Sequence, residues 1–387
     1  MGAMNCSELR RHVALEGVET VVRVISEAIK EKKLKPDDFS IRDLAESFIE
    51  DGSEWVRNLT SRKGGFKNLQ EAANAVDTTA FSNITGQIVY NKILEGYENP
   101  DFLWPNVCET IPTQFINGER MAGIGGLGDA AELVDEAMPY PMVGTNEEYV
   151  DTPATQRRGM IVPVTRDIII ADRTGLLMDR CGNTGHYLGI NKEKRVLDAV
   201  LGVTNSYKRN GTATNTYLTS GAYINQATNL LVNYTNIEAA ELGLSAITDP
   251  NTGEPILQNP NTIIVPLALR KTAERIVNAT QVGAVDNTVS ASTIRTYFNN
   301  LPKLQGSGGY TILTSAYVKQ RTNSATNWFL GDPKKCFAYM EVWKIETEQA
   351  GNNSEMAFTN DIFMRFKVSE RGVPAIKNPR FMYQSTN

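Results

Sequence analysis

The chain has 387 residues, of which 39 are basic and 44 acidic, so its formal net charge is −5. A protein that mainly grips nucleic acid needs a clear basic surplus, so this balance excludes that class, although not a surface that faces DNA. The length suggests two or three domains or subdomains. The sequence shows no zinc-ligand spacing of cysteines, no signal peptide and no apolar run long enough to span a membrane, so we expect synthesis in the cytosol.

Helical patterns dominate the first hundred residues. Apolar residues between positions 18 and 29 recur at three- and four-residue steps, which predicts a helix that ends near Lys35. Ser40 followed by Asp43 has the spacing of a capping box and predicts the start of a second helix. A third helical pattern covers residues 69–88. None of these helices has an obvious core of its own, so we expect the region to lie along a neighbour.

Helical periodicity fades between about Pro112 and Asp167. Two β-type runs, IPTQFINGERM and GMIVPVTRDIII, stand at the ends of this stretch, and the segment between them is rich in glycine and proline. A connection of this length without structure of its own is uncommon inside a compact domain. The sequence therefore predicts a long, projecting two-stranded arm.

A single long helix is predicted after Asp172, because apolar residues continue in helical spacing until Gly202. Gly182 and Gly185 are expected to disturb this helix. The pattern beyond it is mixed. It predicts helices at Ile237–Ile247 and Leu269–Val277, strands at Thr262–Leu267 and Tyr310–Val318, and late strands in the runs FAYMEVWKIE and DIFMRFKVSE.

Two motifs resemble ligand sites but have the wrong surroundings. Residues 123–128, GIGGLG, match the GxGxxG pattern of dinucleotide sites, yet prolines follow too soon for the helix that a βαβ unit needs. Asp249 and Gly253 are placed as in a calcium loop, but the position of the bidentate glutamate is Pro260, which favours a simple turn. Because the chain has only two histidines and no nucleophile motif, we expect no catalytic residue, no cofactor and no metal site.

Charge is distributed unevenly along the chain. The stretch 115–160 is mainly acidic, and the segment 361–387 is mainly basic. Opposite charges on an arm and on a body are typical of docking between neighbouring subunits, with electrostatics setting the register, although a merely solvated surface is the alternative. The candidate inter-subunit residues are Glu132, Asp135, Glu136, Glu147, Glu148, Arg157, Arg158, Arg365, Lys367 and Arg371.

Several segments resemble one known family in their order and spacing. They are FINGERMAGIGGLGD, YVDTPATQRRGMIVPVTRDIIIADRTGLL, LGINKEKRVLDAVLG, and DPNTGEPI followed by NTIIVPLAL. The similarity runs from about Phe81 to Val277 and is to the major capsid proteins of tailed double-stranded DNA bacteriophages, which have the HK97-type fold. The remaining residues fit this family mainly through the architecture that they would complete.

The resemblance implies an α+β fold in five segments. These would be a helical N-terminal arm (1–105), an extended β-hairpin called the E-loop (106–166), a spine helix of the peripheral domain (167–202), an axial domain (203–335) and peripheral-domain strands (336–387). Because the N-terminal segment is short, we expect no proteolytic removal of a scaffolding region.

The resemblance also implies a structural function without enzymatic activity. Subunits would assemble as pentamers and hexamers into an icosahedral shell around packaged double-stranded DNA, which they would meet without sequence specificity. The implied partners are further copies of the chain, a portal protein, and possible scaffolding and decoration or cement proteins, with no membrane involved. The protein would be found in the virion capsid after assembly in the host cytoplasm.

Two other interpretations remain open. An encapsulin-like cellular compartment shares the fold and would require a groove for a cargo peptide on its inner face. A nucleotide-dependent enzyme that uses residues 123–128 is the more distant alternative, and ligand binding by the purified protein would reveal it.

Some members of the family cross-link covalently when an E-loop lysine condenses with an asparagine of a neighbour. This chain has no lysine between Ile111 and Ile190. We therefore expect dissociated shells to give a single subunit band on a denaturing gel, whereas a ladder of linked subunits would contradict the prediction. Cohesion would then come from buried area, arm overlap, charge pairing or a cement protein.

Overall fold

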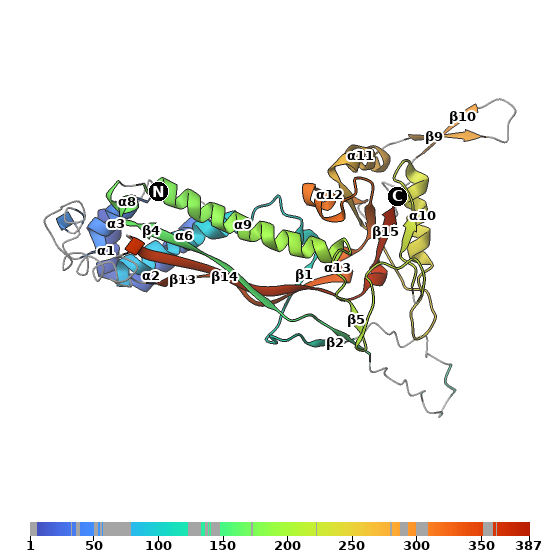
Figure 1. Cartoon of the computed structure of the whole chain (residues 1–387), viewed down its shortest axis with the longest axis horizontal. Coiled ribbons are helices and arrows are strands. Elements are labelled where there is room, and N and C mark those ends of the chain that lie inside the picture. The colour runs from blue at the N-terminus through green and yellow to red at the C-terminus, as the bar shows by residue number, and fades with distance from the viewer. Residues whose placement is uncertain are drawn as a thin grey trace. The chain divides into compact units, whose positions relative to one another are not determined.

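The computed structural model describes residues 6–31, 33–35, 39–49, 53–54, 56, 79–122, 133–135, 138, 140, 148–171, 173–221, 223–278, 281–286, 293–298, 309–350, 359–360 and 362–387. The chain divides into two compact units, each built from three separate segments. Unit 1 comprises Met1–Phe102, Arg157–Asn191 and Trp343–Arg371, and unit 2 comprises Leu103–Gln156, Lys192–Val342 and Gly372–Asn387. Helices and strands are mixed along the chain, which confirms the α+β prediction (Figure 1).

Unit 1 begins with helices that follow local sequence signals. The apolar stripe of α2 is turned inward, with Val21 and Ile25 buried. Ser40 caps α3 as predicted, since its hydroxyl accepts the Asp43 N–H at 3.2 Å. The third predicted helix is present from Thr79 onward, and its earlier part lies outside the described residues. These helices are α1 (Cys6–Glu16), α2 (Val18–Lys30), α3 (Ile41–Phe48) and α6 (Thr79–Tyr97).

The long helix α9 (Thr174–Val200) is continuous, so the expected disturbance at its glycines is wrong. Within unit 1 these glycines instead allow α6 to approach closely. A Cβ at Gly185 would overlap the main-chain carbonyl of Ile93, and a Cβ at Gly96 would overlap that of Gly182. The helix ends where predicted, because Gly202 has a φ of +70°, the left-handed conformation that glycine adopts most easily after a helix.

The long strands form a sheet in the order β1-β13-β14-β4. Its members are β1 (Glu109–Pro112), β4 (Gln156–Thr165), β13 (Phe337–Ala350) and β14 (Ile362–Ile376). The two late strands are thus confirmed. The two runs that were expected to form the arm do not pair with each other in the described residues, because β1 pairs with β13 and β4 lies at the other edge. The end of the second run is also not a strand, since Arg166–Ile170 forms helix α8.

Unit 2 contains a five-stranded sheet in the order β11-β8-β12-β15-β7. Every residue of β8 is buried because both faces of the sheet are covered. Ile263 and Val265 pack with α10 and α11 on one face, whereas Ile264 and Phe329 pack with α12 and the end of α9 on the other. The elements are β7 (Gln226–Thr228), β8 (Thr262–Pro266), β11 (Thr311–Ser315), β12 (Trp328–Gly331), β15 (Met382–Thr386), α10 (Tyr234–Ser245), α11 (Arg270–Asn278) and α12 (Ala316–Thr322).

The strand predicted at Tyr310–Val318 is correct only in its first half. It ends at Ser315, whose hydroxyl accepts the Tyr317 N–H at 3.2 Å and starts α12.

The turn predicted at Asp249 is present: its carboxylate accepts the N–H of Asn251 at 2.8 Å, and Gly253 has a φ of +73°. Short elements complete unit 2, namely α7 (Trp104–Val107), α13 (Pro333–Cys336), the 3-10 helices η2 (Leu267–Leu269) and η4 (Pro379–Phe381), and the antiparallel pair β9 (Gln281–Asp286) and β10 (Thr293–Phe298).

Charged side chains hold the last turns of α9 within unit 2. The Glu193 carboxylate accepts the main-chain N–H groups of Leu103 at 3.1 Å and Trp104 at 2.8 Å. Burial raises the pKa of Glu193, whereas these two donors lower it. Asp198 forms a two-pronged ion pair with Arg321. Polar contacts as well as apolar packing therefore fix the position of this end of the helix.

Candidate functional site

The base of the predicted arm is a four-stranded sheet in unit 2 with the order β2-β3-β5-β6. Strands β2 (Arg120–Ala122) and β3 (Tyr149–Asp151) form an antiparallel pair at the two ends of the predicted arm. Strands β5 (Lys208–Arg209) and β6 (Thr212–Ala213) form a small hairpin beside β3. The arm is thus attached to a second hairpin that sequence analysis did not identify.

A tight turn makes this second hairpin rigid. Asn210 and Gly211 join β5 to β6 with φ values of 49° and 77°, the two left-handed residues that a type I′ turn requires. The Asn-Gly pair was a visible signal for such a turn in the sequence. The Asn210 side chain also accepts the Tyr149 N–H at 3.0 Å, and the Asn210 N–H donates to the Tyr149 carbonyl at 2.9 Å. The turn is therefore hydrogen-bonded to β3 through both the side chain and the main chain of Asn210.

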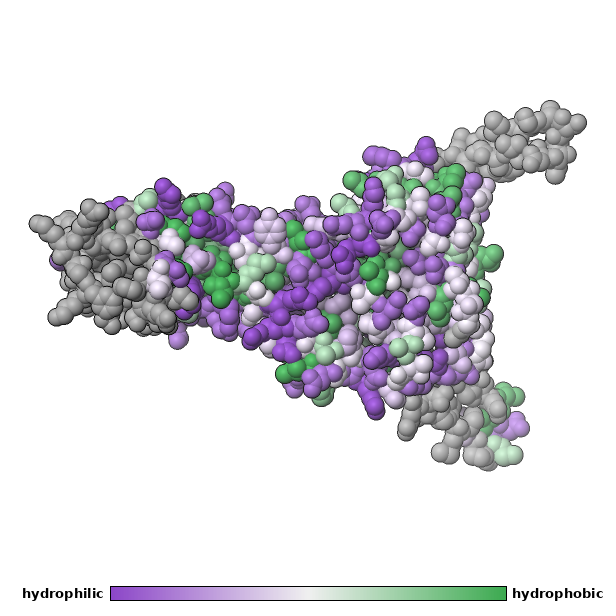
Figure 2. All heavy atoms as spheres, in the orientation of Figure 1, coloured by the Kyte–Doolittle hydropathy of each residue, from purple (hydrophilic) through white to green (hydrophobic). Residues whose placement is uncertain are grey.

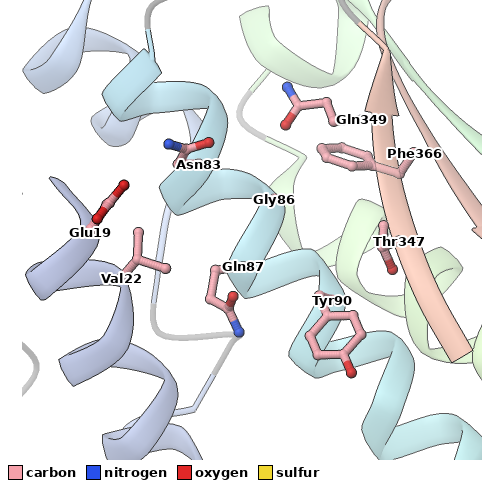
Figure 3. A pocket seen from close by; sticks show the side chains of 9 residues that line it. All are labelled: Glu19, Val22, Asn83, Gly86, Gln87, Tyr90, Thr347, Gln349 and Phe366. Carbon is pink, nitrogen blue, oxygen red and sulfur yellow. The ribbon is translucent and has the colours of Figure 1, made fainter. Parts of the chain in front are cut away.

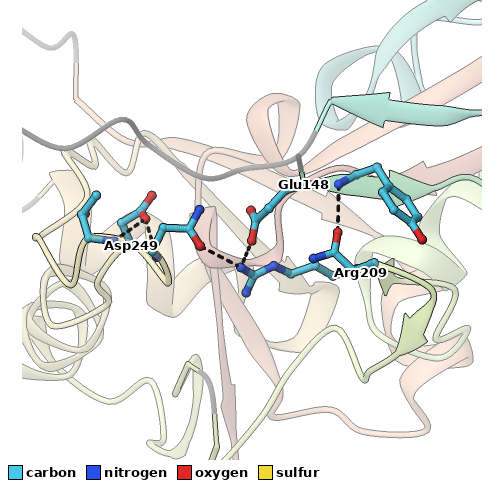
Figure 4. A network of polar contacts seen from close by, with 7 residues as sticks. Glu148, Arg209 and Asp249 are labelled. Atoms are coloured by element: carbon cyan, nitrogen blue, oxygen red, sulfur yellow. Dashed lines mark hydrogen bonds and ion pairs between the residues drawn. The ribbon is translucent and has the colours of Figure 1, made fainter. Parts of the chain in front are cut away.

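An ion pair between Glu148 and Arg209 lies at the same point (Figure 4). The Glu148 side chain is only 8% exposed and Arg209 is 24% exposed, so water screens the pair weakly. Arg209 also donates to the Asn251 side chain at 3.4 Å, which connects the arm to the Asp249 turn. Within unit 2, one guanidinium thus joins the start of β3 to the body.

Replacing Arg209 by alanine is expected to loosen the arm. The change leaves the largely buried Glu148 carboxylate without its ion-pair partner, which costs about 1–3 kcal/mol. Trypsin should then cleave at Arg120 on β2 roughly tenfold faster than in the wild-type chain, because a tenfold change corresponds to about 1.4 kcal/mol of local opening. Lys208→Ala, a change at the adjacent exposed residue, is the control and should leave the rate unchanged.

The structure separates the ten candidate inter-subunit charges into three groups. Glu132, Glu136 and Glu147 lie outside the described residues. Four others already have contacts within their own chain: Glu148 with Arg209, Lys367 with Glu348, Arg371 with the ring of Trp343 at 5.5 Å, and Arg158 on β4. Of the remaining three, Asp135 is exposed, Arg157 lies on the exposed first half of β4, and Arg365 is half-buried on β14. Among the candidates that the structure describes, neither Asp135 nor Glu148 forms an ion pair with Arg157, Arg365, Lys367 or Arg371.

The basic residues of β14 share one face of the strand. Met364, Phe366 and Val368 are buried, so the alternating positions 365 and 367 point away from the core. Arg371 has the same parity. The period of two could have been identified from the sequence, since all three basic positions are odd.

Features of other protein classes are missing from the described part of the chain. No cluster of three or more His, Cys, Asp or Glu residues there could hold a metal ion. None of its helices is both long and apolar enough to cross a membrane. The GIGGLG segment, residues 123–128, lies outside the described residues.

Comparison with known proteins gives one extensive match. A family model described as "Phage capsid protein" matches residues 148–385, more than half of the 387 residues. No curated protein matches the chain.

Among solved structures, the chain is similar to one from Mycobacterium phage Bobi, with 13% identity over 73% of this chain and 89% of that chain and a TM-score of 0.41. It is also similar to a virus-like particle from Pyrococcus furiosus, with 11% identity, 77% and 98% coverage and a TM-score of 0.42. A third is the Cyanophage Pam1 capsid, with 12% identity, 72% and 88% coverage and a TM-score of 0.43.

The family model matches more than half of the chain, and its mixture of helices and strands is that of an HK97-type α+β fold. The chain belongs to the phage capsid protein family, as a major capsid protein: a structural, non-enzymatic component of the virion capsid whose copies assemble into a shell.

Proposed function

We propose that the chain assembles as pentamers and hexamers into a closed icosahedral shell that encloses packaged double-stranded DNA. The observation that carries the proposal is the family match over residues 148–385, which includes the long helix and the five-stranded sheet. The formal net charge of −5 supports a container for DNA that does not bind it tightly.

In this proposal each segment has an assembly task. The residues to about 105 act as an arm along a neighbour, residues 106–166 as the overlapping E-loop, and residues 203–335 as the axial domain around which capsomers form. A portal protein occupies one vertex, scaffolding and decoration proteins are further partners, and assembly takes place in the host cytoplasm. Individually weak contacts hold because a closed lattice repeats them many times.

The surface is compatible with many small contacts. Polar side chains predominate on the face shown in Figure 2, and the apolar ones lie in small separate groups. Exposed apolar side chains of unit 2 include Val232, Leu242 and Leu257. Such scattered groups suit a wet, reversible interface better than a single permanent one.

We propose that the candidate charges connect neighbouring subunits. Acidic residues of the predicted E-loop (residues 106–166) of one subunit would meet basic residues of β14 of the next. Arg365 is the sharpest probe, because Lys367 and Arg371 already have contacts in their own chain. Arg365→Glu is expected to slow assembly about tenfold at low salt and less at high salt, since salt screens exposed charges. Light scattering at two ionic strengths measures this effect, and equal assembly rates of variant and wild type would contradict the proposal.

The test of the shell is expression of the chain alone, followed by negative-stain electron microscopy of the large fraction. Closed shells, or rings of five and six subunits, are the expected result. DNA among the contents during co-expression with the neighbouring phage genes supports the genome container, whereas enzymes as contents favour the encapsulin-like alternative. A monomer that persists even with those genes present would overturn the proposal.

A further inference from the structure

Unit 1 contains a hollow of about 510 Å³, separate from the candidate charges. Its walls are α2, α6 and the strands β13 and β14 (Figure 3). The volume is typical of binding sites, which measure roughly 300–1,000 Å³. Gly86 of α6 keeps the hollow open on one side, because a Cβ there would come within 3.2 Å of the Gln349 side chain.

The lining has an apolar floor and a polar rim. Phe366 is fully buried, and Val22 and Tyr90 are half-buried beside it. The side-chain amides of Asn83, Gln87 and Gln349 also line the hollow, together with the Thr347 hydroxyl, which is buried and has no hydrogen-bond partner among the described residues.

One carboxylate, Glu19, is the only charged group among the described residues that line the hollow. It is exposed and forms no ion pair with another described residue. The amide carbonyls, the hydroxyl and the carboxylate offer hydrogen-bond acceptors, and the carboxylate gives the lining a net negative charge. A long side chain with an apolar stem and a cationic head matches this lining, and a guanidinium fits best because it presents five donors in a fixed plane.

The shell itself supplies such a side chain on every neighbouring copy. Residues 156–161 of β4 are all exposed, although they belong to a regular strand at the edge of its sheet. Exposed edge strands are normally protected, and an unprotected one is available for contact with another chain. Arg157 lies in this stretch and makes no ion pair with another described residue, whereas Arg158 already interacts within its own chain.

We propose that the hollow lined by Glu19 and Phe366 receives the Arg157 side chain of a second copy. The guanidinium lies against Glu19 and the rim amides, and its methylene stem covers Phe366. The contact rests on the proposed self-assembly and adds to it a specific ion pair between Arg157 of one copy and Glu19 of the next. Such a head-to-tail contact can repeat around a ring.

A charge-swap experiment on the full chain tests this contact. The variants are Glu19→Arg, Arg157→Glu and the double variant, and self-association is measured by sedimentation velocity. Each single variant is expected to weaken association at least about tenfold because it places like charges together, and the double variant should recover most of the loss. Glu27→Arg, which changes another exposed acid of α2, is the control and should associate like the wild type.

The unfolding midpoint of each variant shows whether the variant still folds. Glu19→Gln removes the negative charge without adding a positive one, so it should weaken self-association less than Glu19→Arg does. The inference is overturned if both single variants associate normally, or if the double variant is no better than the worse single variant. It is overturned as well if the wild-type chain does not self-associate. Self-association without closed shells, by contrast, refutes only the proposed icosahedral assembly. The effect of the charge swap on self-association can still be measured in that case.

Discussion

Gly185→Ala is expected to destabilise the unassembled chain by about 3 kcal/mol, the upper end of the usual cost of overpacking. The added methyl group would overlap the main-chain carbonyl of Ile93, lying 2.9 Å from its carbon. Main-chain atoms inside a helix cannot turn away as a side chain can, so α6 and α9 must separate. The loss of their packing should appear as a lower urea midpoint for unfolding.

Gly175→Ala provides the matched control on the same helix. Gly175 is exposed, and a Cβ there would meet no atom within 4 Å. Alanine favours the helix, so this variant should be unchanged or up to about 1 kcal/mol more stable. Equal effects of the two substitutions would show that helix propensity, and not the contact with α6, determines the result at Gly185.

Glu341→Ala is expected to cost about 3–5 kcal/mol because it removes an ion-pair partner of a buried lysine. The residue Lys192 is 1% exposed, and its ammonium lies 3.7 Å from the Glu341 carboxylate. The ammonium also lies 3.9 Å from the centre of the Trp104 ring and 4.1 Å from that of Tyr339. These rings stabilise the charge but do not neutralise it.

Two further variants separate the charge from the packing. The double variant Lys192→Met, Glu341→Leu should recover most of the stability, since apolar side chains of similar size can replace a buried ion pair. Glu346→Ala removes an exposed carboxylate from the same strand and should change the unfolding midpoint little. A Glu341→Ala variant as stable as Glu346→Ala would show that the pair contributes nothing.

The candidate site illustrates how local and distant information differ. The basic residues of β14 could be placed on one face from their spacing, and the Asn210–Gly211 turn carried a clear hairpin signal. The partner of that turn could not be predicted, because Arg209 and Glu148 are 61 positions apart in the sequence. No periodicity connects residues so distant, and an ion pair between them exists only once two strands have been brought side by side.

The sequence by itself determined the features that depend on neighbouring residues. The inward stripe of α2, the Ser40 cap, the end of α9 at Gly202 and the fully buried strand β8 all follow from local spacing and from the conformations that single residues allow. The charge balance and the absence of lysine from residue 111 to residue 190 are also properties of the sequence alone.

Only the tertiary structure decided which distant segments meet. It placed β1 beside β13 and β4 beside β14, although the runs at the two ends of the arm were expected to pair with each other. Gly185, which was expected to disturb its helix, instead lies in close contact with the main chain of Ile93. The charged side chain of Lys192 is buried. The physical reason is the same in each case: strand pairing, helix approach and burial depend on the shape and charge of partners far away in the chain, which local patterns do not contain.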